Sequence, residues 1–366
     1  MHDVTREGAE TGGASDAFAF TGTWREYLPI ALSNLALTIV TIGVYRFWAK
    51  ARERRYLWSR TRFIDDRLEW TGTGREMFIG FLMVMLVLIL PLFALNFLAQ
   101  ALALRGNAGA AGLLFIALYL GILYLAGFAR FRALRYRLSR TYWHGIRGGA
   151  EDGGFRYAVS ALWKPIAGAL AIGVMVPWSM TSLWNERWNA MSFGPNRFEG
   201  GAQWPSLVGR WIMLLISPIV LLAAGGIVAM IAAPGLEGVA RQAGPAVMSI
   251  IGLVILLGIY GLIAFVGLGY YAAYFRECVG TLGLGKLEFV FEARSRHWLL
   301  LFLGDVALVI CTLGVGIAFL GYRHWSFFIR HLGATGEVDL EQLTQSTTTG
   351  PREAEGFADA FDIGAI

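Results

Sequence analysis

Cysteine and charge are both scarce in this chain. Its 366 residues include two cysteines, Cys278 and Cys311, too few for a disulfide framework and unable to form a CxxC zinc site. Charged residues make up 16% of the chain, whereas soluble domains carry about a quarter. A single water-soluble globule is therefore excluded. The hydrophobic fraction of 56% excludes disorder across the whole chain.

Familiar catalytic motifs are also missing from the sequence. It contains no GxxxxGK[ST] phosphate loop and no GxSxG nucleophile elbow, and its glycine-rich stretch 280–285 fits no nucleotide fingerprint. The few histidines show no HExxH or similar metal-ligand spacing: His2, His144, His297, His324 and His331. The sequence therefore predicts a protein that is not an enzyme and that holds no metal or cofactor.

Long apolar runs are what the chain does contain. A membrane-spanning helix needs about 20 predominantly apolar residues. Four runs without a charged residue reach that length: Met77–Leu104, Gly106–Ala129, Trp211–Leu236 and Gln242–Phe275. The abundance of tryptophan (13) and glycine (46) agrees with a helical membrane protein.

Three further apolar runs are weaker. Leu28–Val44 contains Asn34, Ile166–Trp178 has 13 residues, and Trp298–Leu320 contains Asp305. A charged or strongly polar group at bilayer depth is costly unless it faces protein or water. These runs therefore have two interpretations, as ordinary spans or as re-entrant helices that enter and leave on one side.

The distribution of positive charge favours the re-entrant interpretation. Cytoplasmic loops are enriched in Lys and Arg. Arg46–Arg75 carries nine basic residues and Arg130–Arg156 carries seven. With four full spans and three partial helices, all of the 31 basic residues except Arg105 and Arg241 fall on one side. We therefore expect a multi-pass protein with four crossings and a cytoplasmic C-terminus, seven crossings being the alternative.

An internal repeat supports this topology. At an offset of 130 residues, Ile42-Gly43-Val44 matches Ile172-Gly173-Val174, and at an offset of 271 Thr41–Val44 matches Thr312–Val315. Equivalent units share an orientation unless the repeat is inverted, which requires an even number of crossings in each unit. We assign a polar N-terminal tail, two full repeats, a truncated third repeat and an acidic, disordered C-terminal tail, at residues 1–19, 20–130, 131–276, 277–332 and 333–366.

Short extended pieces precede several apolar segments. Alternating apolar and polar residues flank Asp65-Asp66 and Gly194-Pro195-Asn196, which is typical of a strand, a turn and a second strand. The predicted fold is thus an all-α integral membrane protein. Its repeated unit is one partial or re-entrant helix plus two transmembrane helices, with short cytoplasmic β-hairpin-like elements.

Several segments resemble a known family. They are Phe20-Thr21-Gly22, Glu26-Tyr27, Asn34, Thr41–Tyr45, Phe47-Trp48, Arg52, Arg55-Tyr56, Thr61, Thr141–Arg147 and Pro177-Trp178. This pattern resembles the YjgN-like family of bacterial inner-membrane proteins, over roughly residues 18–335. The resemblance implies a multi-pass protein of the bacterial inner membrane and no defined activity. The third repeat departs from the pattern, with Gly316 and Gly321 where the first repeat has Tyr45 and Lys50.

The segment 46–62 interleaves aromatic side chains with positive charge. Its candidate headgroup contacts are Trp48, Arg52, Arg54, Arg55 and Tyr56. Aromatic side chains beside cations can also describe a nucleic-acid groove. The neighbouring membrane run instead favours an interfacial belt that anchors the chain, or a site for anionic lipid headgroups. We therefore expect the lipid bilayer as partner, with anionic headgroups, and no nucleic acid.

Asn34, Lys164 and Asp305 occupy equivalent positions in the three repeats. If the partial helices are broken and meet, these side chains could line a shared cavity and satisfy one another, as in transporters built from discontinuous helices. The alternative is that each pairs locally at the interface. The leading functional hypothesis is transport or handling of a lipid-like or amphiphilic solute. The alternative is a non-catalytic scaffold that docks a partner protein through its cytoplasmic loops and tail.

Overall fold

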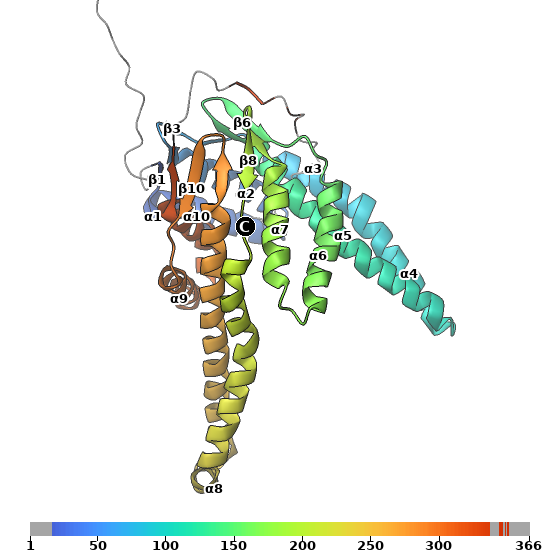
Figure 1. The fold of residues 1–366 in the computed structure, drawn as a ribbon, viewed down its shortest axis with the longest axis vertical. Coiled ribbons are helices and arrows are strands. Elements are labelled where there is room, and N and C mark those ends of the chain that lie inside the picture. The colour runs from blue at the N-terminus through green and yellow to red at the C-terminus, as the bar shows by residue number, and fades with distance from the viewer. Residues whose placement is uncertain (1–16, 337–343, 347, 349, 351–366) are drawn as a thin grey trace, which may run out of the picture.

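A body of short strands carries long helices that project from it (Figure 1). A computed structural model describes residues 17–336, 344–346, 348 and 350. The strands form one three-stranded sheet in the order β1-β2-β3 and one eight-stranded sheet in which β4 to β11 follow in sequence order. We call these two sheets the strand layer. Its members are β1 (Phe18–Phe20), β2 (Thr61–Phe63), β3 (Asp66–Arg67), β4 (Glu69–Trp70), β5 (Thr141–Trp143), β6 (Ile146–Gly149), β7 (Ser192–Phe193), β8 (Asn196–Gly200), β9 (Leu282–Leu284), β10 (Leu287–Phe291) and β11 (Leu332–Thr335).

The expected strand–turn–strand pieces are present, and they are joined more extensively than the sequence suggests. β2 pairs antiparallel with β3 around the Asp65 turn, and β7 pairs with β8 around Gly194. Every neighbouring pair in the larger sheet is also antiparallel, although the 70 residues between β4 and β5 are mostly helical. The isolated hairpins predicted from the sequence are thus parts of larger sheets.

Three helical hairpins leave the strand layer. The first is α1 (Trp24–Val40) with α2 (Arg46–Ser59), and the second is α6 (Phe155–Leu170) with α7 (Val176–Asn189). The third is α9 (Ser295–Cys311) with the 3-10 turn η2 (Val315–Phe319) and α10 (Leu320–His331). These hairpins contain the three weak apolar runs.

The turns of the three hairpins share one backbone conformation. Ile42, Ile172 and Leu313 have φ values of 51°, 54° and 51°, and each precedes a glycine with positive φ. Bulky and β-branched residues are uncommon in this region, so the coincidence at three places is specific. Each weak apolar run therefore contains the same tight reversal.

Each hairpin begins and ends in paired strands. β1 enters the first hairpin and β2 leaves it, with Phe18 opposite Phe63. The second hairpin lies between β6 and β7, with Gly149 opposite Ser192, and the third lies between β10 and β11. Since paired strands are only about 5 Å apart, both ends of each hairpin lie on the same side of the molecule. Each of the three runs therefore turns back to the side on which it began, as expected of a re-entrant helix.

The strong apolar runs form the long helices. The segments Ala108–Arg140 within α5 (Ala108–Arg140), and Pro205–Val228 and Ala246–Gly280 within α8 (Pro205–Gly280), are each long and apolar enough to cross a membrane. The helix α8 contains a kink at Gly244, which has φ 74°. These segments match three of the four predicted spans.

The remaining predicted span is a helix with a widened turn. It comprises α3 (Gly74–Val84), the π-helical turn η1 (Met85–Ile89) and α4 (Leu90–Leu104), which follow one another directly. Pro91 lies at the start of α4 and has no backbone N–H. A π turn accommodates the proline ring and the missing hydrogen bond, which explains why the span is not one regular helix.

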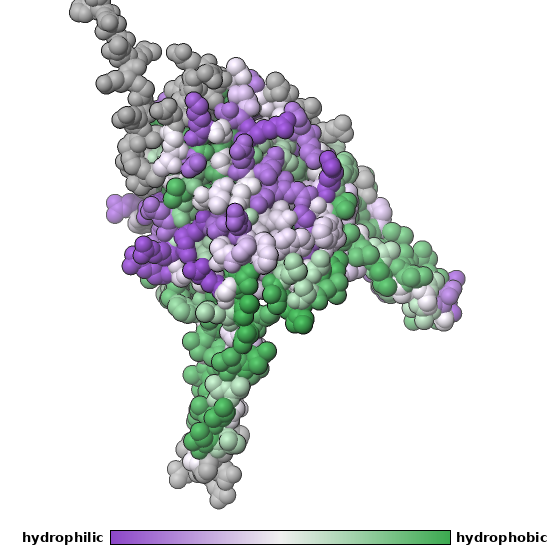
Figure 2. Space-filling view, in the orientation of Figure 1, coloured by the Kyte–Doolittle hydropathy of each residue, from purple (hydrophilic) through white to green (hydrophobic). Residues whose placement is uncertain are grey.

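Hydrophobic residues cover the projecting helices, and hydrophilic residues gather on the body (Figure 2). Leu113 on α5 and Leu222 on α8 are 72% and 67% exposed. The α4–α5 pair and the α8 pair diverge away from the body (Figure 1). The long apolar helices of one chain therefore do not gather into a single bundle.

Aromatic side chains fill the space beneath the strand layer. One buried cluster contains Phe63, Trp143, Phe198 and Phe289, which come from four different strands. The rings of Phe18 on β1 and Phe289 on β10 lie 6.3 Å apart, so the first strand packs near the end of the eight-stranded sheet. The segment β11 belongs to this layer, which corrects the assignment of residues 333–335 to the disordered tail.

Candidate functional site

The aromatic residue Trp48 lies at a packed junction between helices. Its ring is 5.4 Å from Phe78 on α3 and 6.4 Å from Tyr45. A Cβ atom built on Gly74 would lie 2.7 Å from the Trp48 Cα atom, so this approach requires glycine. Trp48 keeps 37% of its surface exposed and therefore still offers an interfacial face.

The arginines of α2 divide between two faces. Arg52 and Arg55 are exposed, and Arg52 Nη1 donates to Ser33 Oγ at 2.9 Å. Arg54 is only 4% exposed and lies over the rings of Trp70 and Trp58, at 4.9 and 5.9 Å. The expectation that Arg54 contacts a headgroup is therefore wrong, because its guanidinium is buried against indole rings. Arg52 and Arg55 remain candidates.

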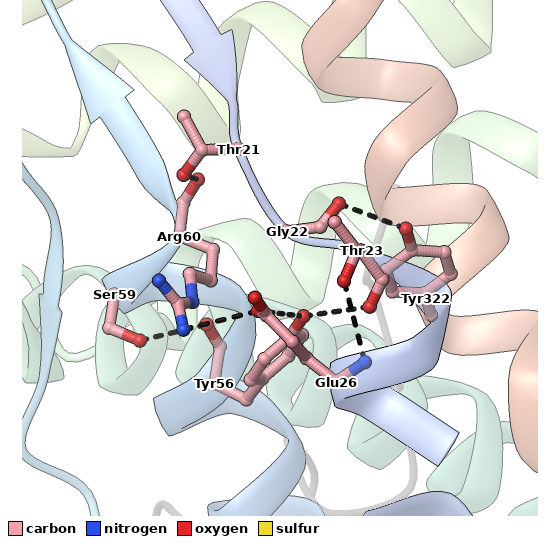
Figure 3. A network of polar contacts seen from close by, with 8 residues as sticks. All are labelled: Thr21, Gly22, Thr23, Glu26, Tyr56, Ser59, Arg60 and Tyr322. Atoms are coloured by element: carbon pink, nitrogen blue, oxygen red, sulfur yellow. Dashed lines mark hydrogen bonds and ion pairs between the residues drawn. The ribbon is translucent and has the colours of Figure 1, made fainter.

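Tyr56 belongs to a polar network at the base of the first hairpin (Figure 3). Its hydroxyl lies 3.0 Å from the Thr23 carbonyl and 3.3 Å from Glu26 Oε2, and Arg60 Nη2 lies 3.1 Å from the same carboxylate oxygen. Burial, followed by the Glu26 charge, raises the pKa of Tyr56 to about 12. The hydroxyl is therefore protonated at neutral pH and acts as a donor that fixes the entry of α1.

The same arrangement recurs at the start of α3. Glu76 Oε1 lies 3.0 Å from Arg140 Nη2, and Tyr136 donates to Glu76 Oε2 at 3.1 Å. Both helices begin at a threonine, Thr23 or Thr73, whose hydroxyl caps the backbone of the glutamate three residues later. The repeated Thr-Gly-Thr sequences at 21–23 and 71–73 were the available signal for this network. Sequence reasoning assigned no role to either glutamate.

The three intramembrane polar candidates have local partners. Asn34 Nδ2 donates to the Ala49 carbonyl at 3.2 Å, and Lys164 Nζ lies 2.7 Å from Glu186 Oε2. Asp305 pairs with Arg323 at 2.6 Å. Each of these contacts joins the two arms of one hairpin. The mutual Asn34–Lys164–Asp305 cluster is therefore not formed, because each side chain makes its contact within its own hairpin. Asn34 Oδ1 is buried and has no hydrogen-bond partner among the described residues.

An open cavity of about 880 Å³ lies where the third hairpin meets the strand layer. Its lining comes from the end of α8, from β10, from the start of α9 and from the end of α10. Basic side chains dominate it, and sequence reasoning did not identify it. The lining residues are Arg276, Phe291, Glu292, Arg294, Ser295, Arg296, His297 and His331.

The chemistry offered by these sites is recognition of negative charge. In the part of the chain that the structure describes, no group of three or more His, Cys, Asp or Glu side chains could hold a metal ion. The exposed cations Arg52 and Arg55, and the basic cavity, lie next to hairpins with apolar surfaces. Such a combination suits an amphiphile with an anionic head.

Comparison with known proteins agrees with the membrane assignment. Over 133 residues the chain is 29% identical to the inner membrane protein YjgN of Escherichia coli O157:H7, covering 36% of this chain and 30% of the relative. It is 34% identical over 73 residues to YjgN of Salmonella typhimurium strain LT2, covering 20% of this chain and 18% of the relative. The aligned parts thus span less than a third of these relatives. No solved structure matches the chain significantly.

The most extensive similarity is to a family of bacterial proteins of unknown function, DUF898. The sequence profile of that family matches residues 15–360, which is most of the chain. This range includes the strand layer, all three helical hairpins and the long apolar helices. The chain belongs to the DUF898 family.

Proposed function

We propose that this protein binds and handles anionic amphiphiles, foremost phospholipids, in the membrane leaflet that faces its strand layer. The observation that carries the proposal is that three hairpins with exposed apolar turn residues are rooted in one strand layer and carry exposed basic side chains. The exposed arginines Arg52 and Arg55 on α2 of the first hairpin provide headgroup contacts. The strand layer holds the three hairpins in fixed relative positions.

The dimensions of the hairpins support a shallow membrane position. The helices α1 and α9 have 17 residues each, or about 25 Å at 1.5 Å per residue. A bilayer core is about 30 Å thick, so such a helix ends within the bilayer. The turn residues Ile42, Ile172 and Leu313 are 94%, 86% and 94% exposed, and lipid would cover this apolar surface.

The charge distribution supports a cytoplasmic strand layer. Among the basic residues that the structure describes, Arg105 and Arg241 are the two that lie at the far ends of the long helices. The positive-inside rule then places the body and the C-terminus in the cytoplasm of a bacterial cell. Arg52 and Arg55 would thereby face the anionic surface of the cytoplasmic leaflet.

We also infer that the hairpins descend from one repeated unit. Asn34, Lys164 and Asp305 follow the offsets of 130 and 271 residues, as do the turn residues with positive φ. In all three hairpins the polar side chain at this position contacts the opposite arm. The shared position suggests that the tie maintains the hairpin rather than a joint substrate site.

The divergence of the long helices favours action within one leaflet over passage across the membrane. The α4–α5 and α8 pairs separate away from the body (Figure 1). A polar route through the bilayer needs surrounding helices that exclude lipid. A single chain would have to rearrange, or to associate with others, to build such a route.

The test is lipid selectivity in nanodiscs. Native mass spectrometry would compare bound phosphatidylglycerol with bound phosphatidylcholine for the protein and for the double variant Arg52→Gln/Arg55→Gln. Each exposed cation near an anionic surface contributes about 1 kcal/mol, so we expect a loss of roughly 10- to 30-fold in preference. The control Arg62→Gln/Arg67→Gln removes the same charge from exposed positions of β2 and β3. Unchanged selectivity in the first variant would refute the proposal.

A scaffold is the second candidate, and one observation favours it. Residues near the C-terminus return to the strand layer, where Gln345 Nε2 donates to the Gly145 carbonyl at 2.9 Å and Gln345 Oε1 accepts from the Arg147 backbone at 3.1 Å. A lipid-handling protein keeps its lipid preference after removal of residues 351–366. If the protein is a scaffold, the same truncation abolishes the complexes with a partner protein that crosslinking captures in cells. In that case Arg52→Gln/Arg55→Gln leaves the lipid preference unchanged.

A further inference from the structure

We propose that the cavity between α8, β10, α9 and α10 is a binding site for a phosphate group. Five of its eight lining side chains are basic, and Glu292 is the single acidic one. The basic side chains come from three different elements: Arg276 from α8, His331 from α10 and the others from the start of α9 and the residue before it. Positive charge from separate parts of the fold is therefore directed to one place.

The arginines of this cavity have no anionic partner within the described residues. Arg294 and Arg296 are exposed, and neither they nor Arg276 form an ion pair with a carboxylate there. Arg276 Nη1 donates to the Ala293 carbonyl at 2.9 Å, which orients its guanidinium beside the cavity. Guanidinium groups bind phosphate through parallel charge-assisted hydrogen bonds, so three of them suit a group with two negative charges.

The surroundings of His297 add a second argument. The Arg294 backbone nitrogen lies 3.2 Å from His297 Nδ1, and Arg296 Nε lies 3.1 Å from His297 Nε2. A neutral imidazole accepts at one nitrogen only, so one of these contacts joins two donors. An oxygen of a phosphate group could accept from both donors.

The backbone at the start of α9 also favours an anion in the cavity. The helix α9 begins at Ser295 and runs for 17 residues, so its first N–H groups and its positive dipole end lie at the cavity. The rings of His297 and His331 lie 4.8 Å apart. Burial, together with His331, Arg296 and Arg294, lowers the pKa of His297, which reflects the concentrated positive charge.

The phosphate group that binds in this cavity could belong to a phospholipid headgroup or be free phosphate. The same helix exposes Leu300, Phe302 and Leu303 within two turns of the cavity, by 67%, 50% and 52%. Acyl chains could follow this apolar face while the phosphate occupies the cavity. The lipid source rests on the proposed function, whereas phosphate binding itself does not.

The experiment measures binding of inorganic phosphate in detergent and of phosphatidic acid in nanodiscs. The variant Arg294→Gln/Arg296→Gln removes two exposed cations of the cavity, and Arg62→Gln/Arg67→Gln is the charge-matched control. We expect the cavity variant to weaken phosphatidic acid binding at least about tenfold and the control to bind as the unaltered protein does. His297→Gln, which keeps the charge at neutral pH, should weaken binding to a smaller extent.

The outcomes separate the two sources. Loss of both phosphate and phosphatidic acid binding in the cavity variant supports a site for the phosphate group itself. Loss of phosphatidic acid binding alone supports the site with a lipid as its ligand. Equal binding of both probes by the variant and the control overturns the inference. Since this test leaves Arg52 and Arg55 intact, its failure is distinguishable from failure of the proposed function.

Discussion

Lys164 Nζ and Glu186 Oε2 lie 2.7 Å apart and join the two arms of the second hairpin. The Lys164 side chain is 12% exposed and the Glu186 side chain is 31% exposed, and Lys164 also donates to Ser182 Oγ at 2.8 Å. Removal of one member leaves a partly buried charge without its partner, which costs more than removal of both.

Lys164→Met should therefore lower the free energy of unfolding by about 1 to 3 kcal/mol. The double variant Lys164→Met/Glu186→Met should recover part of this loss. Thermal unfolding in detergent measures both effects. Arg197→Gln is the control, since it breaks an ion pair with Glu151 whose side chains are 72% and 68% exposed, and it should change stability by less than about 0.5 kcal/mol. Equal effects of Lys164→Met and Arg197→Gln would contradict the assignment.

Neighbouring arginines on α2 should differ in what they control. Arg54→Gln removes a buried cation from above two indole rings, which should cost about 1 to 3 kcal/mol of stability. Arg55→Gln affects an exposed position and should leave the melting temperature nearly unchanged while it lowers the preference for anionic lipid. Parallel melting and lipid-binding measurements on the two variants check this. If Arg54→Gln lowered the preference for anionic lipid and left the melting temperature unchanged, the structural role assigned to Arg54 would be wrong.

A methyl group at Gly74 should disturb the contact between α2 and α3. The added Cβ would lie 2.7 Å from the Trp48 Cα atom, which is backbone and cannot turn away. We expect Gly74→Ala to destabilise the protein by about 1 to 3 kcal/mol. In Gly209→Ala the new methyl group meets no atom within 4 Å, so this helical control should be neutral or slightly stabilising. The pair can be compared by chemical or thermal unfolding.

Acidification should weaken the protein through His297. Its pKa is lowered in the folded state, so at a pH between that value and about 6.5 the unfolded chain binds a proton that the folded protein does not. Stability from this group is present above pH 6.5 and is lost as the pH falls. The groups that face it in the cavity are Arg294 and Arg296 beside it, Arg276, His331 and Glu292.

Phosphate should reverse part of that loss, because an anion favours the protonated ring. Melting temperatures from pH 5 to pH 8, with and without phosphate, measure the effect. The phosphate-dependent part should be smaller in His297→Gln. If the variant and the unaltered protein show the same pH dependence and the same response to phosphate, the residue does not titrate in the way argued here.

The membrane position of the hairpins can be tested by cysteine labelling. Cys278 and Cys311 would be replaced, and single cysteines placed at Ile42, at Ile172 or at Leu313. These tips should resist a membrane-impermeant maleimide from both sides of the membrane. Cysteines at Gln203 and Gly283, in the strand layer or next to it, should react from the cytoplasmic side alone. Reaction of either of these two positions from the periplasm would overturn the proposed orientation.

Apolar run length was sufficient to predict the three helices that are long and apolar enough to cross a membrane. Residue spacing would have shown that Arg54 lies on a buried helix face. The buried residues Phe47, Ala51, Arg54 and Trp58 follow the 4-3-4 spacing of one helix face. Residue chemistry alone placed Arg54 with Arg52, while helix geometry places the two on different faces.

The strand layer and the basic cavity were harder to predict from the sequence. Strands of two to five residues carry little periodic signal, and their pairing joins segments separated by whole helices. The cavity combines Arg276, His297 and His331, which come from separate helices. Offsets between repeats placed Asn34, Lys164 and Asp305 at equivalent positions, but equivalence within a repeat does not imply contact. The contact partner of each of these side chains lies instead on the second helix of the same hairpin.

The paired strands at the root of each hairpin have a mechanical consequence for a bilayer. A helix that crosses the membrane adds similar cross-sectional area to both leaflets, whereas a hairpin that returns to its own side adds area to one. Three such hairpins, held by β1–β2, β6–β7 and β10–β11, would expand the leaflet on the side of the strand layer. The resulting area difference between leaflets favours a membrane that is convex on that side.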